Sequence, residues 1–129
     1  MRSIRIVLPV LTFCLATLVA QDELSQYQTW MKGAAGANGA AKKGVAAKDV
    51  AATAAAAKTA AENFDKIAGF FKSKHKDDAV AFAETARDAA KAAAAATTSE
   101  DQAAALAKIG PTCAGCHGLY RDGNKFKGL

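Results

Sequence analysis

Apolar residues recur at steps of three and four along four stretches of this chain, and this helical spacing restricts its fold more than any other feature. The most regular stretch covers residues 46–71, with its stripe at Val50, Ala54, Ala57, Ala61, Phe64, Ala68 and Phe71. The other stripes run through Leu24, Tyr27, Met31, Ala34, Asn38 and Ala41, through Ala79, Phe82, Ala86, Ala89, Ala93 and Ala96, and through Leu106, Ile109, Cys113, Cys116 and Tyr120. No stretch shows the every-second-residue alternation of a half-buried strand. The chain is therefore predicted to be all-α.

Polar segments separate the predicted helices. Residues 72–76, Lys-Ser-Lys-His-Lys, interrupt the apolar spacing, and Asp77 and Asp78 follow where negative charge suits a helix N-terminus. Ser99 and Gln102 form a capping-box pattern for the last helix. Four helices with such short connections favour an antiparallel four-helix bundle.

The last predicted helix contains a proline. Pro111 lies just before the cysteines, so a kink or a restart of the helix is expected there. The tail, residues 122–129, is polar and contains glycine, and we expect it to be frayed.

The apolar residues are small. Alanine supplies most of the 51% hydrophobic content, and such a chain buries little side-chain area, so a large apolar ligand in its interior would add much stability. Gly33, Gly36 and Gly39 each weaken the first helix by about 1 kcal/mol relative to alanine, which suggests close approach to a neighbouring helix or a flat cofactor. The alternative is a structural, alanine-rich helical protein without a cofactor.

The first 20 residues have the character of an export signal. Arg2 and Arg5 precede a nearly continuous apolar run, residues 6–20. The run is shorter than the roughly 20 residues of a comfortable membrane span, so an uncleaved anchor is the less favoured alternative. Phe13 before Cys14 does not fit a lipoprotein signal. We expect residues 1–20 to be removed and residues 21–129 to form one exported domain without stable membrane insertion.

The net charge argues against nucleic-acid binding. Loss of Arg2 and Arg5 lowers the 17 basic residues to 15, against 12 acidic ones, a formal charge of +3. This mild excess is not a nucleic-acid signature, and the lysines are mixed with acidic residues as on a solvated helical surface. A weak preference for acidic partner proteins is compatible with it.

The segment Cys113-Ala-Gly-Cys116-His117 is the attachment signature of c-type haem. On a helix these three side chains share one face. Two thiols so placed can add to the vinyl groups of one porphyrin edge, while the imidazole binds the iron as proximal ligand. Two remaining cysteines are too few for a disulfide framework. We expect one covalent haem c, bonded to Cys113 and Cys116, with His117 on the iron.

Two other chemistries use the same residue types. A redox-active Cys-x-x-Cys of the thioredoxin kind is expected after a strand in a βαβ unit, and no strand is predicted here. Zinc takes four nitrogen or sulfur ligands. Cys113, Cys116 and His117 supply three, and His75 is the only other histidine. Both alternatives are less favoured than haem attachment.

Met31 is the candidate sixth ligand of the iron. It lies on the inward stripe of the first helix and is the only methionine outside the predicted signal. A thioether there raises the reduction potential and keeps the iron low-spin. The alternative role for Met31 is core packing, the usual role of a methionine at helical spacing. His75 lies in the lysine-rich loop and is expected at the surface.

Arg121 and Tyr120 follow His117 by four and three residues and are expected near the proximal face of the haem. There Arg121 can hydrogen-bond a propionate or a proximal ligand. The alternative is a solvated helix end.

Together these residues resemble the class II c-type cytochromes, the cytochrome c prime family. The segment Gly110-Pro-Thr-Cys113-Ala-Gly-Cys116-His117-Gly-Leu-Tyr120-Arg121 is similar to the family's terminal pattern. Residues 27–39 resemble its first helix, with Met31 at the position that faces the distal side of the haem. The chain departs from the family at Gln28, where an arginine is usual, and at Pro111.

The resemblance implies a four-helix bundle over the whole mature chain, in a family whose members often form dimers. A methionine at the distal position implies the low-spin, electron-transferring type. The predicted function is therefore a periplasmic monohaem cytochrome that passes single electrons between redox partner proteins. The alternative is a five-coordinate member that binds nitric oxide or carbon monoxide. A six-coordinate iron has no open site, and the sequence shows no triad or paired catalytic carboxylates, so the chain is predicted not to be an enzyme.

Overall fold

The computed structural model describes residues 10–123 and 125–128, and this part of the chain is almost entirely helical. Its elements are α1 (Val10–Ala46), α2 (Val50–Ser73), α3 (Asp77–Ala95), α4 (Ser99–Leu106), α5 (Ile109–Tyr120), β1 (Arg121–Asp122) and β2 (Lys125–Phe126). The all-α prediction is confirmed apart from the small antiparallel pair of β1 and β2. Residues 1–9 of the predicted export signal lie outside the described residues.

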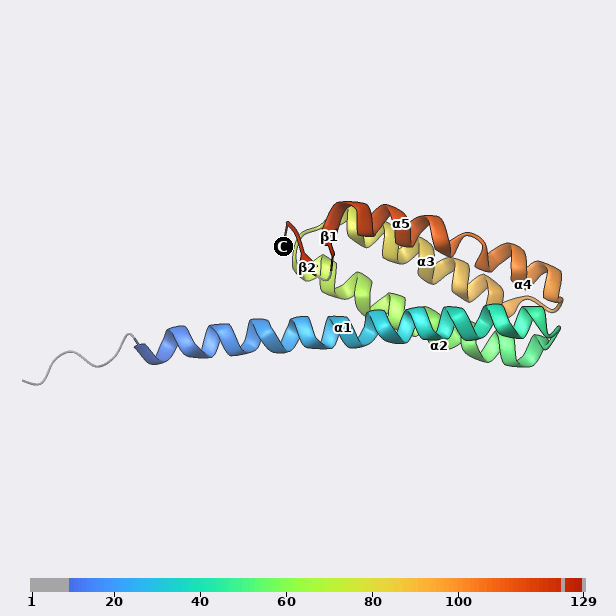
Figure 1. Cartoon of the computed structure of the whole chain (residues 1–129), viewed down its shortest axis with the longest axis horizontal. Helices are drawn as coiled ribbons and strands as arrows, with labels where there is room; N and C mark the ends of the chain where they lie inside the picture. Colours follow the sequence, from blue (N-terminus) through green and yellow to red (C-terminus); the bar gives the residue numbers. More distant parts are fainter. Residues whose placement is uncertain (1–9, 124, 129) are drawn as a thin grey trace, which may run out of the picture.

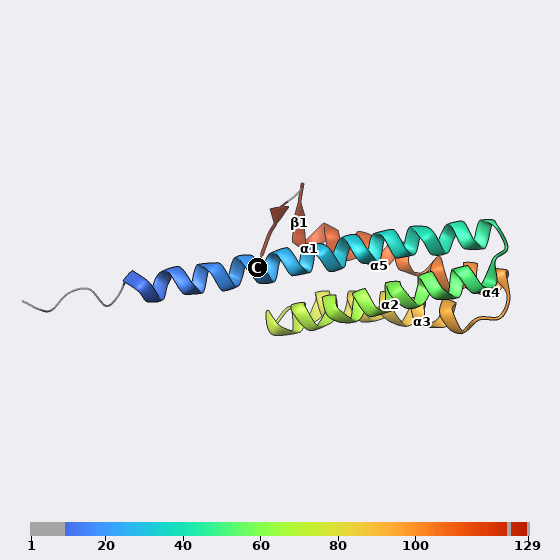
Figure 2. The same ribbon diagram turned by 90° about the horizontal axis from the view of Figure 1, so that it is seen from below.

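Short connections bring the helices side by side (Figures 1 and 2). α2 packs against both α1 and α3, α3 also packs against α4 and α5, and α4 contacts α1. α4 and α5 follow one another along the same side of the molecule (Figure 1). α1 runs unbroken across the predicted cleavage point after residue 20, and its N-terminal part extends past the other helices.

The buried faces of the helices are the predicted apolar stripes. Ala41, Phe71 and Ile109 are fully buried. The largest side chains gather at one end of the molecule, where the rings of Tyr27, Phe70 and Phe71 contact one another with centroids 4.7 to 5.5 Å apart. The remaining core is mostly alanine, so the helices pack through small side chains.

The break before the cysteines has the predicted form of a helix restart. α4 ends at Leu106 and α5 begins at Ile109. Pro111 is therefore the third residue of α5, where its missing N–H would have had no acceptor within the helix. The proline is compatible with a straight α5, which carries both cysteines.

The capping box predicted from Ser99 and Gln102 is wrong by one residue. Thr98 is the N-cap of α4: its hydroxyl oxygen accepts a hydrogen bond from the Asp101 amide at 3.1 Å. Gln102 instead lies on the buried face, where its Nε2 donates to the Val50 carbonyl oxygen at 3.0 Å. Thr98 and Ser99 both have side chains that can cap a helix, so the residue types alone do not distinguish them.

The prediction of a frayed tail is also wrong. β1 pairs with β2, and the ring of Phe126 packs against Tyr27 with centroids 4.7 Å apart. Gly123 has a positive φ of 59° in the turn between the strands, a conformation that glycine adopts without strain. The tail therefore folds back over the aromatic end of the molecule.

Close helix approach explains only one of the three glycines singled out in α1. A Cβ on Gly33 would lie 2.8 Å from Asn63 Oδ1, whereas one on Gly36 or Gly39 would meet nothing within 4 Å. The closest approach is at Gly44, where a Cβ would overlap the Thr53 side chain and lie 3.0 Å from the Thr53 backbone nitrogen. Gly44 thus lets α1 and α2 meet at their connection.

Alanine substitution at two glycines of α1 should have opposite effects on stability. Gly44→Ala should destabilise the fold by about 1–3 kcal/mol, because the Thr53 backbone cannot move without separating the helices. Gly36→Ala is the matched control: it has open space, and we expect it to stabilise by about 0.5–1 kcal/mol through helix propensity. Urea unfolding measures both. A stabilising Gly44→Ala would contradict the packing described here.

Candidate functional site

The Cys113–His117 motif lies in the middle of α5, against α3. Cys113, Cys116 and His117 are each partly buried. Gly115 within the motif allows the helices to approach closely, because a Cβ there would lie 2.6 Å from the ring of Phe82 on α3. A larger residue at position 115 would push α5, and the motif with it, away from the core.

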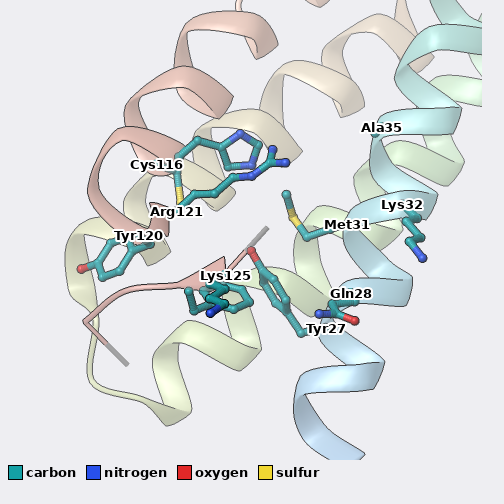
Figure 3. Close-up of a pocket in the computed structure, with 11 residues that line it drawn as sticks. Tyr27, Gln28, Met31, Lys32, Ala35, Cys116, Tyr120, Arg121 and Lys125 are labelled. Carbon is teal, nitrogen blue, oxygen red and sulfur yellow. The ribbon is translucent and has the colours of Figure 1, made fainter. Parts of the chain in front are cut away.

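Two adjoining cavities lie beside this motif. The outer cavity, of about 420 Å³, lies between α1 and the C-terminal end of α5 and is bounded by β2 (Figure 3). The inner cavity is much smaller, about 30 Å³, and its walls include Phe64, Ile67 and Phe82. Four side chains line both cavities: Tyr27, Met31, Cys116 and His117.

The structure brings together all the site residues predicted from the sequence. Met31 on α1 shares both cavities with Cys116 and His117 on α5, Cys113 lines the inner cavity, and Arg121 lines the outer one. The side chain of Met31 points across the outer cavity toward Arg121 (Figure 3).

His75, the other histidine, lies apart from this site. It is exposed in the turn between α2 and α3, with a positive φ of 56°, and it lines neither cavity. The prediction of a surface position for His75 is confirmed.

Burial sets the protonation of the two thiols. It raises the pKa of Cys113 and raises the pKa of Cys116 to about 11, with the neighbouring sulfur and Asp78 adding to the shift at Cys116. A redox-active Cys-x-x-Cys needs a lowered thiol pKa. Both strands of the described chain also follow α5, whereas a thioredoxin-type motif follows a strand. These observations weigh against a thiol–disulfide role.

Burial also affects the imidazole and the buried phenol of the site. It lowers the pKa of His117, helped by the positive charge of Arg121, so the ring is neutral at pH 7 and keeps a lone pair for a metal. Burial, with a contribution from Cys116, raises the pKa of Tyr27 well above its ordinary value. Tyr27 therefore faces the cavity as a protonated donor.

Arg121 is attached to the hairpin by one hydrogen bond. Its Nε donates to the Gly123 carbonyl oxygen at 2.6 Å. The rest of the guanidinium extends into the outer cavity toward Met31 (Figure 3). Since no ion pair with a carboxylate is found for Arg121 among residues 21–123 and 125–128, its terminal nitrogens are available to a ligand.

Sequence reasoning did not assign six of the residues that line the outer cavity to the site: Tyr27, Gln28, Lys32, Ala35, Lys125 and Phe126. Tyr27 was predicted only as a core residue, although its spacing of four from Met31 puts the two side chains on one helix face. Lys125 and Phe126 were predicted to be in a frayed tail. The Gly123-Asn124 dipeptide, a pair favoured in two-residue hairpin loops, was the available signal.

Tyr120 connects α5 to α3 at the edge of the site. Its hydroxyl donates a short hydrogen bond to Asp78 Oδ1. This bond lowers the pKa of Asp78 below its ordinary 3.8 and raises the pKa of Tyr120 from 10.0 to about 12. The bond is complete when Asp78 is charged and Tyr120 is neutral.

The Tyr120–Asp78 bond predicts a pH window for part of the stability. The folded pKa of Asp78 is lowered, so its contribution is present above pH 3.8 and is lost as the pH falls through the folded value. The folded pKa of Tyr120 is raised, so its contribution is lost as the pH rises from 10.0 through about 12. Tyr120→Phe should lower the unfolding temperature most between these limits. An equal loss at pH 3 and pH 7 would contradict the bond.

Within residues 10–123 and 125–128, no group of three or more His, Cys, Asp or Glu side chains is placed to hold a metal ion. In the same part of the chain, no helix is both long and apolar enough to cross a membrane. Comparison with protein-family models, curated proteins and solved structures gave no match.

Proposed function

We propose that this chain is an exported electron-carrying c-type cytochrome, with one covalent haem c in an antiparallel four-helix bundle of the cytochrome c prime kind. One observation carries the proposal: Met31 from α1 lines the same two cavities as Cys116 and His117 from α5. A haem-attachment motif thus faces, across a cavity, the only methionine after residue 20.

The donor set and the cavity fit a haem. Cys113 and Cys116 would hold the porphyrin through thioether bonds, and the His117 imidazole and the Met31 thioether would bind the iron. The outer cavity, about 420 Å³, falls within the roughly 300–1,000 Å³ typical of cofactor sites. A haem iron supplies reversible one-electron chemistry when bound.

The chain's own residues determine what that site can do. The apolar walls of the inner cavity, Phe64, Ile67 and Phe82, exclude water, and a dry environment raises the potential of a low-spin iron. A haem iron held by both His117 and Met31 would have no position left for a substrate. Electron transfer is therefore favoured over catalysis.

The position of α1 supports export and removal of residues 1–20. The N-terminal part of this helix extends past its neighbours, and among residues 21–123 and 125–128 the first buried side chain is Tyr27. Removal of the segment before Gln21 would therefore leave the buried residues that the structure records in place. The mature protein is proposed to act in the periplasm.

Expression in a host that attaches haem to exported cytochromes tests the proposal. The product should be red, should keep its haem after denaturation and acid–acetone extraction, and should have the mass of a chain that begins near Gln21 plus one haem. The same gene in a host without the attachment machinery is the control. A colourless product from the competent host would contradict the proposal and favour a structural, alanine-rich protein.

A further inference from the structure

We propose that Tyr27, Arg121 and Lys125 form a carboxylate-binding edge in the outer cavity, and that this edge fixes the orientation of the bound ligand. The inference rests on the proposed function, because it takes the ligand to be a porphyrin with carboxylates on one edge. It assigns a positioning role to a tyrosine of α1 and to the C-terminal hairpin.

The two cavities differ in charge. The side chains of Arg121 and Lys125 make the outer cavity cationic, and no Asp or Glu of the described chain lines it. The walls of the inner cavity contain no lysine, arginine or carboxylate among the described residues. A ligand that extends through both would place its apolar part inside and its anionic part outside.

The hairpin places both of these cations at the cavity. Lys125 is positioned by the pairing of β2 with β1, opposite Asp122, and by the neighbouring Phe126 ring, which packs on Tyr27 at 4.7 Å. Arg121 is the first residue of β1. Its side chain makes one hydrogen bond within the described residues, from Nε to the Gly123 carbonyl oxygen. Its long side chain can thus move from the cavity centre to the edge when a ligand enters. Lys32 points away from the cavity and is left out of the edge (Figure 3).

Tyr27 supplies the neutral donor of the edge. Its ring is only 5% exposed and is held by contacts with Phe70, Phe71 and Phe126. Its hydroxyl points into the outer cavity (Figure 3) and makes no hydrogen bond with the described residues 21–123 and 125–128 that the structure records. A rigid phenol with an unused O–H is a donor aimed at whatever fills the cavity.

The position of the cysteines agrees with this polarity. Cys113 lines only the inner cavity, whereas Arg121 and Lys125 line only the outer one. In a haem the vinyl groups that react with cysteine lie on the edge away from the two propionates. Cys116 lines both cavities and so lies between Cys113 and the two cations. A porphyrin attached through these cysteines would therefore direct its propionate edge toward Arg121 and Lys125.

Binding of a porphyrin without iron tests the edge separately from the iron ligands. The full mature chain, produced without haem attachment, is titrated with protoporphyrin IX and with its dimethyl ester, followed by quenching of Trp30 fluorescence. We expect the free acid to bind about tenfold more tightly, which corresponds to about 1.4 kcal/mol. Tyr27→Phe and Lys125→Gln should each reduce this preference, and Lys127→Gln, an exposed lysine outside both cavities, should keep it.

Equal binding of the acid and the ester would overturn the carboxylate edge and leave the proposed haem function in place. A preference for the acid in a chain that attaches no haem in a competent host would support the edge and contradict the cytochrome.

A second measurement on the haem-containing protein covers the case in which the haem-free chain does not fold. The reduction potential of a haem changes with pH where a propionate ionises. Lys125→Gln removes a cation and Tyr27→Phe removes a hydrogen-bond donor. Each should raise the pKa of the propionate, and with it the pH at which the potential changes, by about one unit. If the potential changed at the same pH in both variants as in the unmodified protein, the proposal would be overturned, because a purely structural role of these residues predicts no difference in that pH.

Discussion

Replacing Met31 with alanine should convert the protein from an electron carrier that ignores carbon monoxide into one that binds it stoichiometrically. Met31 is the only methionine after residue 20, and its side chain lines both cavities opposite the haem motif. If Met31 binds the iron as proposed, alanine removes the thioether and leaves one position of the iron open. The helix itself should remain, since alanine has the highest helix propensity. Absorption spectra of the reduced protein with and without carbon monoxide measure the change.

Leu24→Ala is the matched control for this substitution. Leu24 lies on the same stripe of α1 and is also partly buried, but it lines neither cavity. It should leave the iron six-coordinate. If the unmodified protein already bound carbon monoxide as well as Met31→Ala, the methionine would be a packing residue and the protein a gas-binding cytochrome.

Replacing both Cys113 and Cys116 with alanine should abolish covalent haem. The two thiols are free in the structure and face the cavities from one helix. Without them no thioether bond can form, and haem should be removed completely by acid–acetone extraction. Haem-stained denaturing gels give the measurement, with total protein as reference.

The single substitutions Cys113→Ala and Cys116→Ala are the controls. Each leaves one thiol, and each should retain part of the haem through one bond. Haem that survives extraction from the double variant would show attachment elsewhere and would refute the role of the motif.

The helices were predictable because their apolar spacing is a local property. Phe64 and Phe71 on α2, and Ala86 and Ala93 on α3, are buried as their spacing requires. The meeting of Met31 with Cys116 was predictable for the same reason, since each lies on the inward stripe of its helix. His117 follows because it is four residues after Cys113 and shares its helix face. Long periodic segments keep their signal even when the side chains are small.

The hairpin and the charge of the outer cavity were not predictable from spacing. Each strand has two residues, which is too short to show alternation. Its position depends on Phe126 meeting Tyr27, a contact across about a hundred residues of chain that no local pattern reports. Lys125 belongs to the cavity only because that contact forms.

The close helix contacts at glycines could not be predicted from local sequence either. Gly33, Gly36 and Gly39 are equivalent in the sequence, but only Gly33 meets a neighbouring side chain. Gly44, which makes the closest approach, has no distinguishing local pattern. The tertiary packing of the helices, and not the local sequence, decides which glycine lies against another backbone.

The central claim is best tested by the absorption spectrum of the purified protein with confirmed covalent haem, oxidised and reduced, before and after carbon monoxide. The account predicts a far-red iron–methionine band in the oxidised protein and no response of the reduced protein to carbon monoxide. A broad high-spin spectrum that shifts sharply with carbon monoxide would contradict it and would mean that the sixth position of the iron is open.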